Sequence, residues 1–341
     1  MNPTILLTEP ASTPAAANDA PPAIQVSNLT HRYGERVAVD ALSFDIPQQT
    51  ITAILGPNGS GKTTLFRVLS TLARAQSGEV KIEGVDLASS MAAARQALGV
   101  VFQYPSLDKK LTVLENLHHQ AALYGMPKAT AKERIESATT TFGLTDRLGH
   151  LVETLSGGLQ RRVELAKSLL HHPHILLLDE PSTGLDPGAR SDLRETLARL
   201  RREQNATILL TTHLIDEADF ADRVLIMDQG KLVADGTPQA LRAEVGGDVI
   251  TIKGGDPEAL RQQLKQEHQL ETQPSGADLR LQTAHPQEAM NKLLPLVGGL
   301  IHEVNIGRPT LEDVFFKRTG RLLEEESTEE PVPSAKGKKQ G

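Results

Sequence analysis

The chain has 341 residues, which is enough for about two domains of ordinary size. Its formal net charge is −7 and no long basic run occurs, which argues against sequence-independent nucleic-acid binding as the main activity. There is no cysteine, so disulfides and thiolate metal sites are excluded and a reducing cytosol is the expected location.

Residues 1–22 are rich in Ala, Pro, Thr and Asn, have no hydrophobic period and are predicted to form a disordered tail. Their apolar stretch Ile5–Leu7 has no basic residues before it, so it does not predict a signal peptide. The longest apolar runs, such as Ile175–Leu178, are far shorter than a membrane span. We therefore expect a chain that stays out of the membrane but can lie against a membrane protein.

Short strand patterns at 24–26, 37–39 and 42–46 come before the first glycine-rich loop. Their spacing predicts an antiparallel sheet attached to a nucleotide-binding fold. Tyr33 lies in the polar turn between the first two patterns. It serves either as an edge-strand aromatic or as a platform for an adenine ring, and the residue taken alone favours the structural role.

A loop of the pattern G-x-x-x-x-G-K-[ST] lies between an apolar strand pattern at 51–55 and a helical pattern at 62–73. Glycines let successive backbone N–H groups curl around an anion, and the following helix adds its positive dipole end. Lys62 is expected to reach the terminal phosphates and Thr63 to ligate Mg²⁺. The sequence therefore predicts a nucleoside triphosphate site made by Gly56, Pro57, Asn58, Gly59, Ser60, Gly61, Lys62, Thr63 and Thr64.

The next segments predict a short hairpin at 78–84 and a strand that ends at Gln103, just before Pro105. Apolar residues then recur with a helical period from about 104 to 155, which predicts an inserted helical subdomain. Ser156 is a good N-cap for the next helical pattern, which begins with Gly157 and Gly158. Two glycines weaken a helix start by about 1 kcal/mol each, a cost that makes sense if an anion approaches the backbone there.

Apolar patterns at 174–180 and 206–212 suit central parallel strands, whose ligand sites lie at the carboxyl edge. The first ends in Asp179, expected to hold Mg²⁺ through water, and Glu180, expected to orient or deprotonate the attacking water. The second is followed by His213, which can donate a hydrogen bond to a γ-phosphate. The alternative role for the two acids is capping of the helix near 187–190, and the phosphate loop makes it the poorer one.

The C-terminal third of the chain has a different character. Residues 222–236 predict a hairpin that turns at 228–230. Residues 247–318 alternate strand and helix patterns and predict a small α+β module of the ferredoxin-like type, without recognisable chemistry. The charged residues 319–341 are predicted to form a disordered tail.

Taken in order, these motifs resemble those of the ATP-binding subunit of an ABC transporter over residues 23–245. The family's adenine-stacking loop, Walker A motif and Q-loop are matched by Tyr33, Gly56–Thr64 and Gln103. Its signature motif, Walker B motif with the catalytic glutamate, D-loop and switch histidine are matched by Leu155–Gln160, Ile175–Glu180, Ser182–Asp186 and His213. The resemblance implies an α/β fold: a P-loop NTPase core of the ABC type with antiparallel β and helical subdomains.

Two positions depart from the family pattern. Leu159 stands between the two glycines and Gln160, and residues 49–50 lack the Gly-Glu pair that commonly precedes the Walker A strand. The first departure is similar to the S-G-G-x-x-R-R form, here ending at 161–162, of the drug- and polysaccharide-exporting branch. Pro309–Phe315 also looks like the terminal motif of daunorubicin-resistance-type ATPases.

The resemblance implies ATP and Mg²⁺ as cofactors. It places Thr63, Gln103 and Asp179 at the metal, and gives catalytic roles to Lys62, Gln103, Glu180 and His213. It also implies a homodimer, or a dimer with a related ATPase subunit. Each ATP site would then take its Walker A motif from one chain and be completed by the other chain's Ser156, Gly157, Gly158 and Asp186.

Such a dimer would power an exporter through an integral membrane permease on a separate chain, at the cytoplasmic face of the cell membrane and without direct nucleic-acid contact. Two alternatives stay open. One is the ATPase of an importer, and the other is a non-transport ABC ATPase of translation or DNA maintenance. The single Walker A motif and the absence of a heptad run argue against the second alternative.

Overall fold

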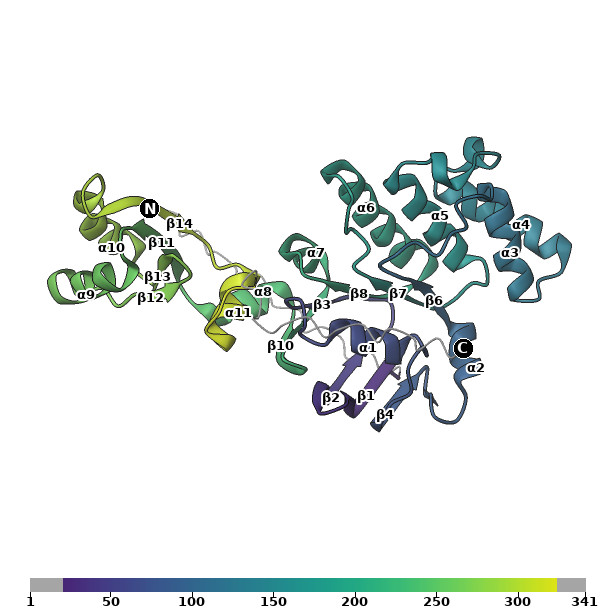
Figure 1. Ribbon diagram of the computed structural model, residues 1–341, viewed down its shortest axis with the longest axis horizontal. Coiled ribbons are helices and arrows are strands. Elements are labelled where there is room, and N and C mark those ends of the chain that lie inside the picture. Colours follow the sequence, from purple (N-terminus) through teal and green to yellow (C-terminus); the bar gives the residue numbers. More distant parts are fainter. Residues whose placement is uncertain (1–20, 324–341) are drawn as a thin grey trace, which may run out of the picture.

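The structure is a computed structural model that describes residues 21–323 (Figure 1). The tails predicted at 1–22 and 319–341 therefore lie almost entirely outside the described residues. A six-stranded sheet with helices on both faces forms the larger part, the cassette, and a four-stranded sheet with its own helices forms a smaller part at the other end (Figure 1). The predicted fold class is confirmed.

The central sheet has the order β10-β9-β3-β8-β7-β6, in which only β10 is antiparallel to its neighbour among the described strands. These strands are apolar because both faces are covered. Neighbouring residues of β3, Ala53 and Ile54, belong to separate hydrophobic cores on the two faces. The bounds are β3 (Ile51–Leu55), β6 (Leu98–Val101), β7 (Ile175–Asp179), β8 (Thr207–Thr212), β9 (Arg223–Asp228) and β10 (Lys231–Gly236).

Helices divide between the two faces of this sheet. On one face lies α1 (Lys62–Leu69), and on the other lie α5 (Gly157–Leu169), α6 (Pro187–Gln204) and α7 (Ile215–Phe220) (Figure 1). The helix predicted at 62–73 ends at Leu69, and Thr71 beyond it has a left-handed backbone with φ 63°. The hairpin predicted at 222–236 is confirmed by β9 and β10.

The antiparallel sheet packs beside α1 and has the order β2-β1-β4-β5 (Figure 1). The two strands predicted within 37–46 are one strand, in which Ala41 has φ 49° at an irregularity of the pairing with β1. A bulge of this kind inserts a residue without ending the strand. The bounds are β1 (Ile24–Tyr33), β2 (Arg36–Ile46), β4 (Ser77–Ile82) and β5 (Val85–Asp86), followed by α2 (Met91–Ala97).

The predicted helical subdomain contains α3 (Val113–Leu123) and α4 (Lys128–Thr141). Both helices pack against α5, which covers the central sheet. Short 3₁₀ turns at Thr145–Arg147 and Val152–Thr154 lead into α5.

The C-terminal module has the element order β-α-β-β-α-β and the antiparallel strand order β12-β13-β11-β14. This is the ferredoxin-like arrangement that the sequence predicts. A separate hydrophobic core lies between its sheet and its helices. The bounds are β11 (Asp248–Gly254), α9 (Pro257–His268), β12 (Gln273–Ser275), β13 (Asp278–Thr283), α10 (Pro286–Leu293), a 3₁₀ turn at Leu294–Leu296 and β14 (Ile301–Gly307).

The last helix of the predicted module packs away from the module's own sheet. After β14 the chain returns to the cassette, where α11 (Leu311–Thr319) packs against α8 (Pro238–Val245), β10 and α7 (Figure 1). Phe315 of α11 is fully buried in the cassette core, and Leu323 joins the same core. The segment 319–323, expected to belong to the charged tail, is therefore packed.

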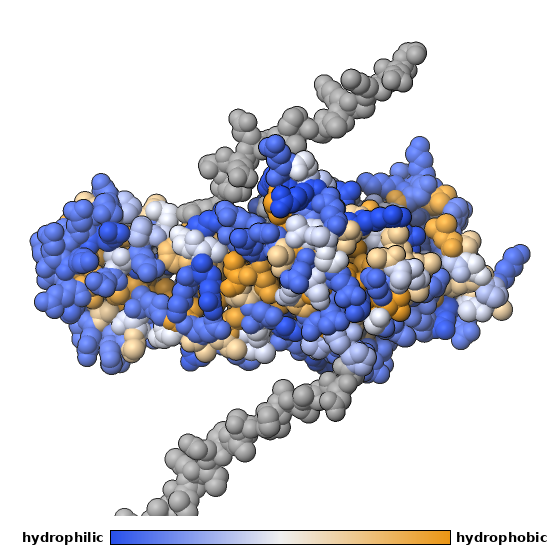
Figure 2. All heavy atoms as spheres, turned by 90° about the horizontal axis from the view of Figure 1, so that it is seen from below, coloured by the Kyte–Doolittle hydropathy of each residue, from blue (hydrophilic) through white to orange (hydrophobic). Residues whose placement is uncertain are grey.

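No helix within the described residues is both long enough and apolar enough to cross a membrane. The face in Figure 2 is mostly hydrophilic, with smaller hydrophobic patches between the hydrophilic regions.

Candidate nucleotide site at the carboxyl edge of the sheet

The phosphate loop connects β3 to α1, as the sequence predicts. Gly59 and Gly61 have φ values of 80° and 101°, which only glycine adopts readily. A Cβ on Gly61 would lie 2.4 Å from the carbonyl oxygen of Ala38. The hydroxyl of Ser60 in this loop is buried without a hydrogen-bond partner among residues 21–323. A concave loop with an unpaired polar group fits an anionic ligand.

Lys62 is 4% exposed and donates hydrogen bonds from Nζ to the carbonyl oxygens of Gly56 at 2.6 Å and Pro57 at 2.9 Å. Its ammonium lies 4.0 Å from Oε1 of Glu180. Burial lowers the pKa of Lys62, and the charges of Glu180 and Asp179 oppose this shift. A phosphate group would add a negative charge where the ammonium is poorly solvated.

Asp179 ends β7 and is 6% exposed. Thr211 Oγ1 on the neighbouring strand β8 donates a hydrogen bond of 2.5 Å to Asp179 Oδ1. Burial raises the pKa of Asp179, while the bond from Thr211 and the charge of Lys62 lower it. The carboxylate of Asp179, the hydroxyl of Thr63 and the amide oxygen of Gln103 are the hard oxygen donors that suit Mg²⁺.

Glu180 is the centre of the contacts at this edge. Its Oε2 accepts hydrogen bonds from Gln103 Nε2 at 3.1 Å and Thr183 Oγ1 at 3.2 Å, and His213 Nδ1 lies 3.4 Å away. Its backbone has φ 43°, and its N–H donates to the carbonyl oxygen of Thr211. A non-glycine residue held in this conformation is a feature of functional sites. The structure thus brings together Gln103, Glu180 and His213 from the ends of β6, β7 and β8.

Tyr33 lies at the end of β1 and is 48% exposed, with its ring packed edge-on against His31 at 5.0 Å. An exposed ring face is what a stacking role for Tyr33 needs. That role stays a prediction.

The signature residues lie on the opposite face of the sheet from the phosphate loop. Ser156 is the N-cap of α5, and its hydroxyl accepts a hydrogen bond of 3.4 Å from the N–H of Leu159. Because α1 and α5 pack in different cores, Gly157 and Gly158 are not part of the site formed by Lys62 in the same chain (Figure 1). Gln160 donates to the carbonyl oxygens of Val152 and Leu155 and so holds the turn before α5.

Asp186 of the D-loop caps α6, accepting a hydrogen bond of 3.0 Å from the N–H of Ala189. Asp186, Ser156 and Gly158 line one cavity of about 350 Å³. Asp186 and the N-terminus of the signature helix therefore line one surface, while Thr183 of the same D-loop contacts Glu180 at the nucleotide site. The predicted contact of Asp186 with a nucleotide stays a prediction.

Two supporting residues, Thr211 and Arg161, were not predicted from the sequence. Arg161 is 6% exposed and donates hydrogen bonds to the carbonyl oxygens of Phe102 at 2.8 Å and Gln103 at 3.2 Å. It also pairs with Glu164 at 3.1 Å. This arginine thus ties the signature helix to the Q-loop. The arginine pair at 161–162 was the available signal, but nothing in the sequence says which of the two is buried.

Comparisons with known proteins agree with this geometry. Residues 39–183 match the family model "ABC transporter", and residues 236–319 match the model for the C-terminal domain of DrrA1-3-like ATP-binding proteins. The chain is 34% identical to the daunorubicin/doxorubicin resistance ATP-binding protein DrrA of Streptomyces peucetius, over 92% of this chain and 97% of DrrA. It is 38% identical to the Nod factor export ATP-binding protein I of Burkholderia orbicola, over 89% of this chain and 98% of that protein.

Solved structures resemble the cassette. CbiO1 from Clostridium perfringens, part of the ABC transporter complex CbiONQ, superposes with a TM-score of 0.62 at 27% identity, covering 73% of this chain and 97% of CbiO1. A dimeric bacterial ABC transporter cassette gives a TM-score of 0.57 at 28% identity, covering 63% of this chain and 98% of the cassette. The chain belongs to the family of ABC transporter ATP-binding proteins, with the C-terminal domain of the DrrA type, and is the ATP-hydrolysing subunit of an ABC exporter.

Proposed function

We propose that two copies of this chain, or one copy and a related subunit, close over two ATP molecules and open again after hydrolysis. The observation that carries the proposal is the separation of Ser156 and Lys62 on opposite faces of the sheet. A single chain cannot place both on one ATP, whereas a head-to-tail dimer can. The likeness to a dimeric cassette supports this arrangement.

Within each site, Lys62 and the N–H groups of the phosphate loop would bind the phosphates, and Tyr33 would stack on the adenine. Asp179, Thr63 and Gln103 would hold Mg²⁺, which when bound neutralises phosphate charge. Glu180 would position and deprotonate the attacking water, and His213, 3.4 Å from its carboxylate, would donate to the γ-phosphate. The N–H groups of Gly157 and Gly158 in the second chain would bind the same phosphate.

The transported molecule would pass through a permease on a separate chain, with this protein at its cytoplasmic face. Support comes from relatives named for daunorubicin resistance, Nod factor export and linearmycin resistance. A pull-down of tagged protein from native membranes tests this. A multi-span protein that raises ATP turnover is expected; ribosomes or DNA without a membrane protein would favour the non-transport alternative.

The dimer proposal is tested with Glu180→Gln. This variant should bind ATP, lose turnover by about 10²-fold or more, and form a dimer with Mg-ATP that light scattering detects. Adding Ser156→Arg should prevent the dimer without removing ATP binding, because Ser156 is remote from Lys62 in its own chain. A Glu180→Gln protein that binds Mg-ATP and stays monomeric would contradict the proposal.

A further inference from the structure

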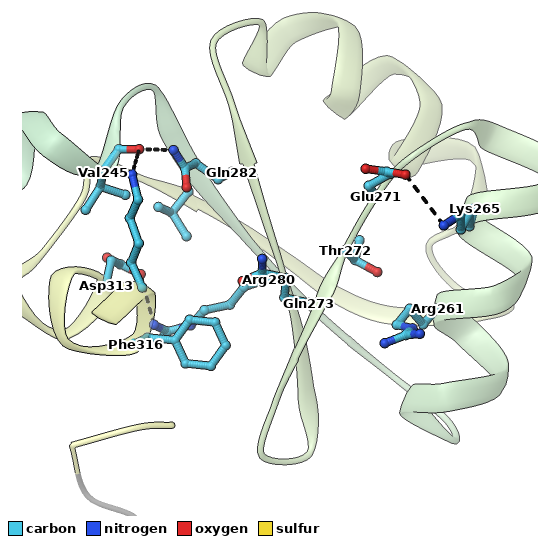
Figure 3. A pocket seen from close by; sticks show the side chains of 12 residues that line it. Val245, Arg261, Lys265, Glu271, Thr272, Gln273, Arg280, Gln282, Asp313 and Phe316 are labelled. Atoms are coloured by element: carbon cyan, nitrogen blue, oxygen red, sulfur yellow. Dashed lines mark hydrogen bonds and ion pairs between the residues drawn. The ribbon is translucent and has the colours of Figure 1, made fainter. Parts of the chain in front are cut away.

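A cavity of about 570 Å³ lies between the C-terminal module and the helices α8 and α11, away from the nucleotide site (Figure 3). Small-molecule sites in proteins have volumes of about 300–1,000 Å³. Its walls come from α8, β11, α9, β13 and α11, so they belong to both parts of the molecule. A ligand in this cavity would touch the module and the cassette together.

One end of the cavity carries two cations and the carboxylate of Glu271. Arg261 and Lys265 lie one turn apart on α9 and face the cavity (Figure 3). Their partners are Glu258 at 3.6 Å and Glu271 at 3.5 Å, whose side chains are 56% and 84% exposed. Ion pairs this exposed to solvent are weak, so a ligand anion can replace these carboxylates at small cost.

A buried hydroxyl at the same end lacks a partner. Thr272 is 8% exposed and lines the cavity beside Glu271 (Figure 3). Its Oγ1 has no hydrogen-bond partner within residues 21–323. A buried polar group without a partner is costly, which points to a ligand that accepts a hydrogen bond from it.

The other end holds the ring of Phe316, and its cations Arg280 and Lys317 already have hydrogen-bond partners. The guanidinium of Arg280 lies 5.5 Å from the centre of the Phe316 ring (Figure 3), and Val249 also lines the cavity. Asp313 accepts hydrogen bonds from Arg280 and from the N–H and hydroxyl of Thr310. Its negative charge is therefore compensated.

We propose that this cavity binds a small amphipathic anion. Its carboxylate, phosphate or sulfonate group lies between Arg261 and Lys265 and accepts a hydrogen bond from Thr272, and its apolar body packs on Val249 and Phe316. Because the ligand contacts both parts of the chain, it stabilises the packing of the module against α11. The site is independent of ATP binding.

Calorimetric titration of the full-length protein, saturated with Mg-ADP, tests the proposal with two probes, decanoate and 8-anilinonaphthalene-1-sulfonate. Each is expected to bind one to one. Thr272→Val, which keeps the side-chain size, and the pair Arg261→Gln with Lys265→Gln should each weaken binding by about tenfold. Lys253→Gln is the matched control, because Lys253 is exposed on the same module and pairs with Glu303; it should leave both affinities unchanged.

Three results would overturn the proposal. The first is the absence of saturable binding of both probes. The second is that decyltrimethylammonium, which carries the opposite charge on a similar alkyl chain, binds as tightly as decanoate. The third is unchanged affinity in the Arg261→Gln, Lys265→Gln protein, as expected if the probes bind instead in the apolar cavity between α3 and α4. Both substituted side chains are exposed, so this variant decides the question even if Thr272→Val fails to fold.

Discussion

Arg161→Met tests the link between the signature helix and the Q-loop. The substitution keeps most of the side-chain length but removes the charge that faces Glu164, which is 3% exposed, and two hydrogen bonds to Q-loop carbonyl groups. Removing one partner of a buried ion pair costs about 3–5 kcal/mol. Glu164 keeps the hydrogen bonds from the N–H and hydroxyl of Ser106, so we expect the lower end, about 3 kcal/mol.

The neighbouring residue provides a matched control. Arg162 pairs with Asp192 on the surface, where the two side chains are 38% and 54% exposed, so Arg162→Met should cost less than about 1 kcal/mol. The double variant Arg161→Met, Glu164→Met removes both buried charges and should be less destabilised than Arg161→Met alone. Urea unfolding followed by circular dichroism measures these three variants and the single variant Glu164→Met.

ATP turnover separates a structural role from a positioning role. Because Arg161 holds the backbone of Gln103, whose side chain contacts Glu180, turnover of the folded Arg161→Met protein should fall by about 10- to 100-fold. The reasoning is refuted if Arg161→Met is no less stable than Arg162→Met. It is also refuted if the free-energy losses of Arg161→Met and Glu164→Met simply add.

Other predictions concern the buried groups of the site and the returning helix. Burial depresses the pKa of Lys62 below 10.5, so the nucleotide-free folded protein binds fewer protons than the unfolded chain between the two values, and its stability rises with pH across that window. Lys62→Met should remove this rise, keep or increase apo stability, and abolish stabilisation by Mg-ATP in thermal shift; a preserved Mg-ATP shift would contradict it. Thr211→Val removes a bond that lowers the pKa of Asp179, so the acid limb of the Mg-dependent ATPase profile should move to higher pH, and an unmoved limb would count against the role of Asp179. Phe315→Ala should cost about 3–5 kcal/mol in urea unfolding because Phe315 is fully buried, whereas Val297→Ala, at a side chain 42% exposed, should cost less than about 0.5 kcal/mol; equal losses would refute the core position of α11.

The convergence of Gln103, Glu180 and His213 could be predicted from the sequence. Each follows an apolar strand pattern, and the carboxyl ends of parallel strands meet at one edge of a sheet. Gln103 and Glu180 are 77 positions apart, yet this rule places them together. The supporting contacts could not be predicted, because Thr211 lies in a strand with other threonines and an arginine in a helix usually faces water.

The sequence also does not predict which hydrophobic core α11 packs in. Its apolar residues mark one face for burial, but hydrophobic burial is non-directional and does not say which core the face joins. The alternating strand and helix patterns of 247–318 placed it with the C-terminal module, whereas Phe315 packs in the same core as the cassette. The edge strand β12 was missed because Gln273–Ser275 contains a proline and has no alternation.

The two ends of the Gln103 amide explain why glutamine suits this position. Its side-chain N–H₂ group donates to Glu180 at 3.1 Å, which leaves the side-chain oxygen Oε1 to ligate the proposed Mg²⁺. A glutamate would repel Glu180, and a leucine would contact neither partner by hydrogen bonding. Because Arg161 holds the backbone of the same residue from the signature helix, a shift of α5 changes where the amide lies. Gln103 would thus contact the metal, the carboxylate of Glu180 and the signature helix. A movement of the helical subdomain would then shift Gln103 and so change the geometry of the hydrolytic site.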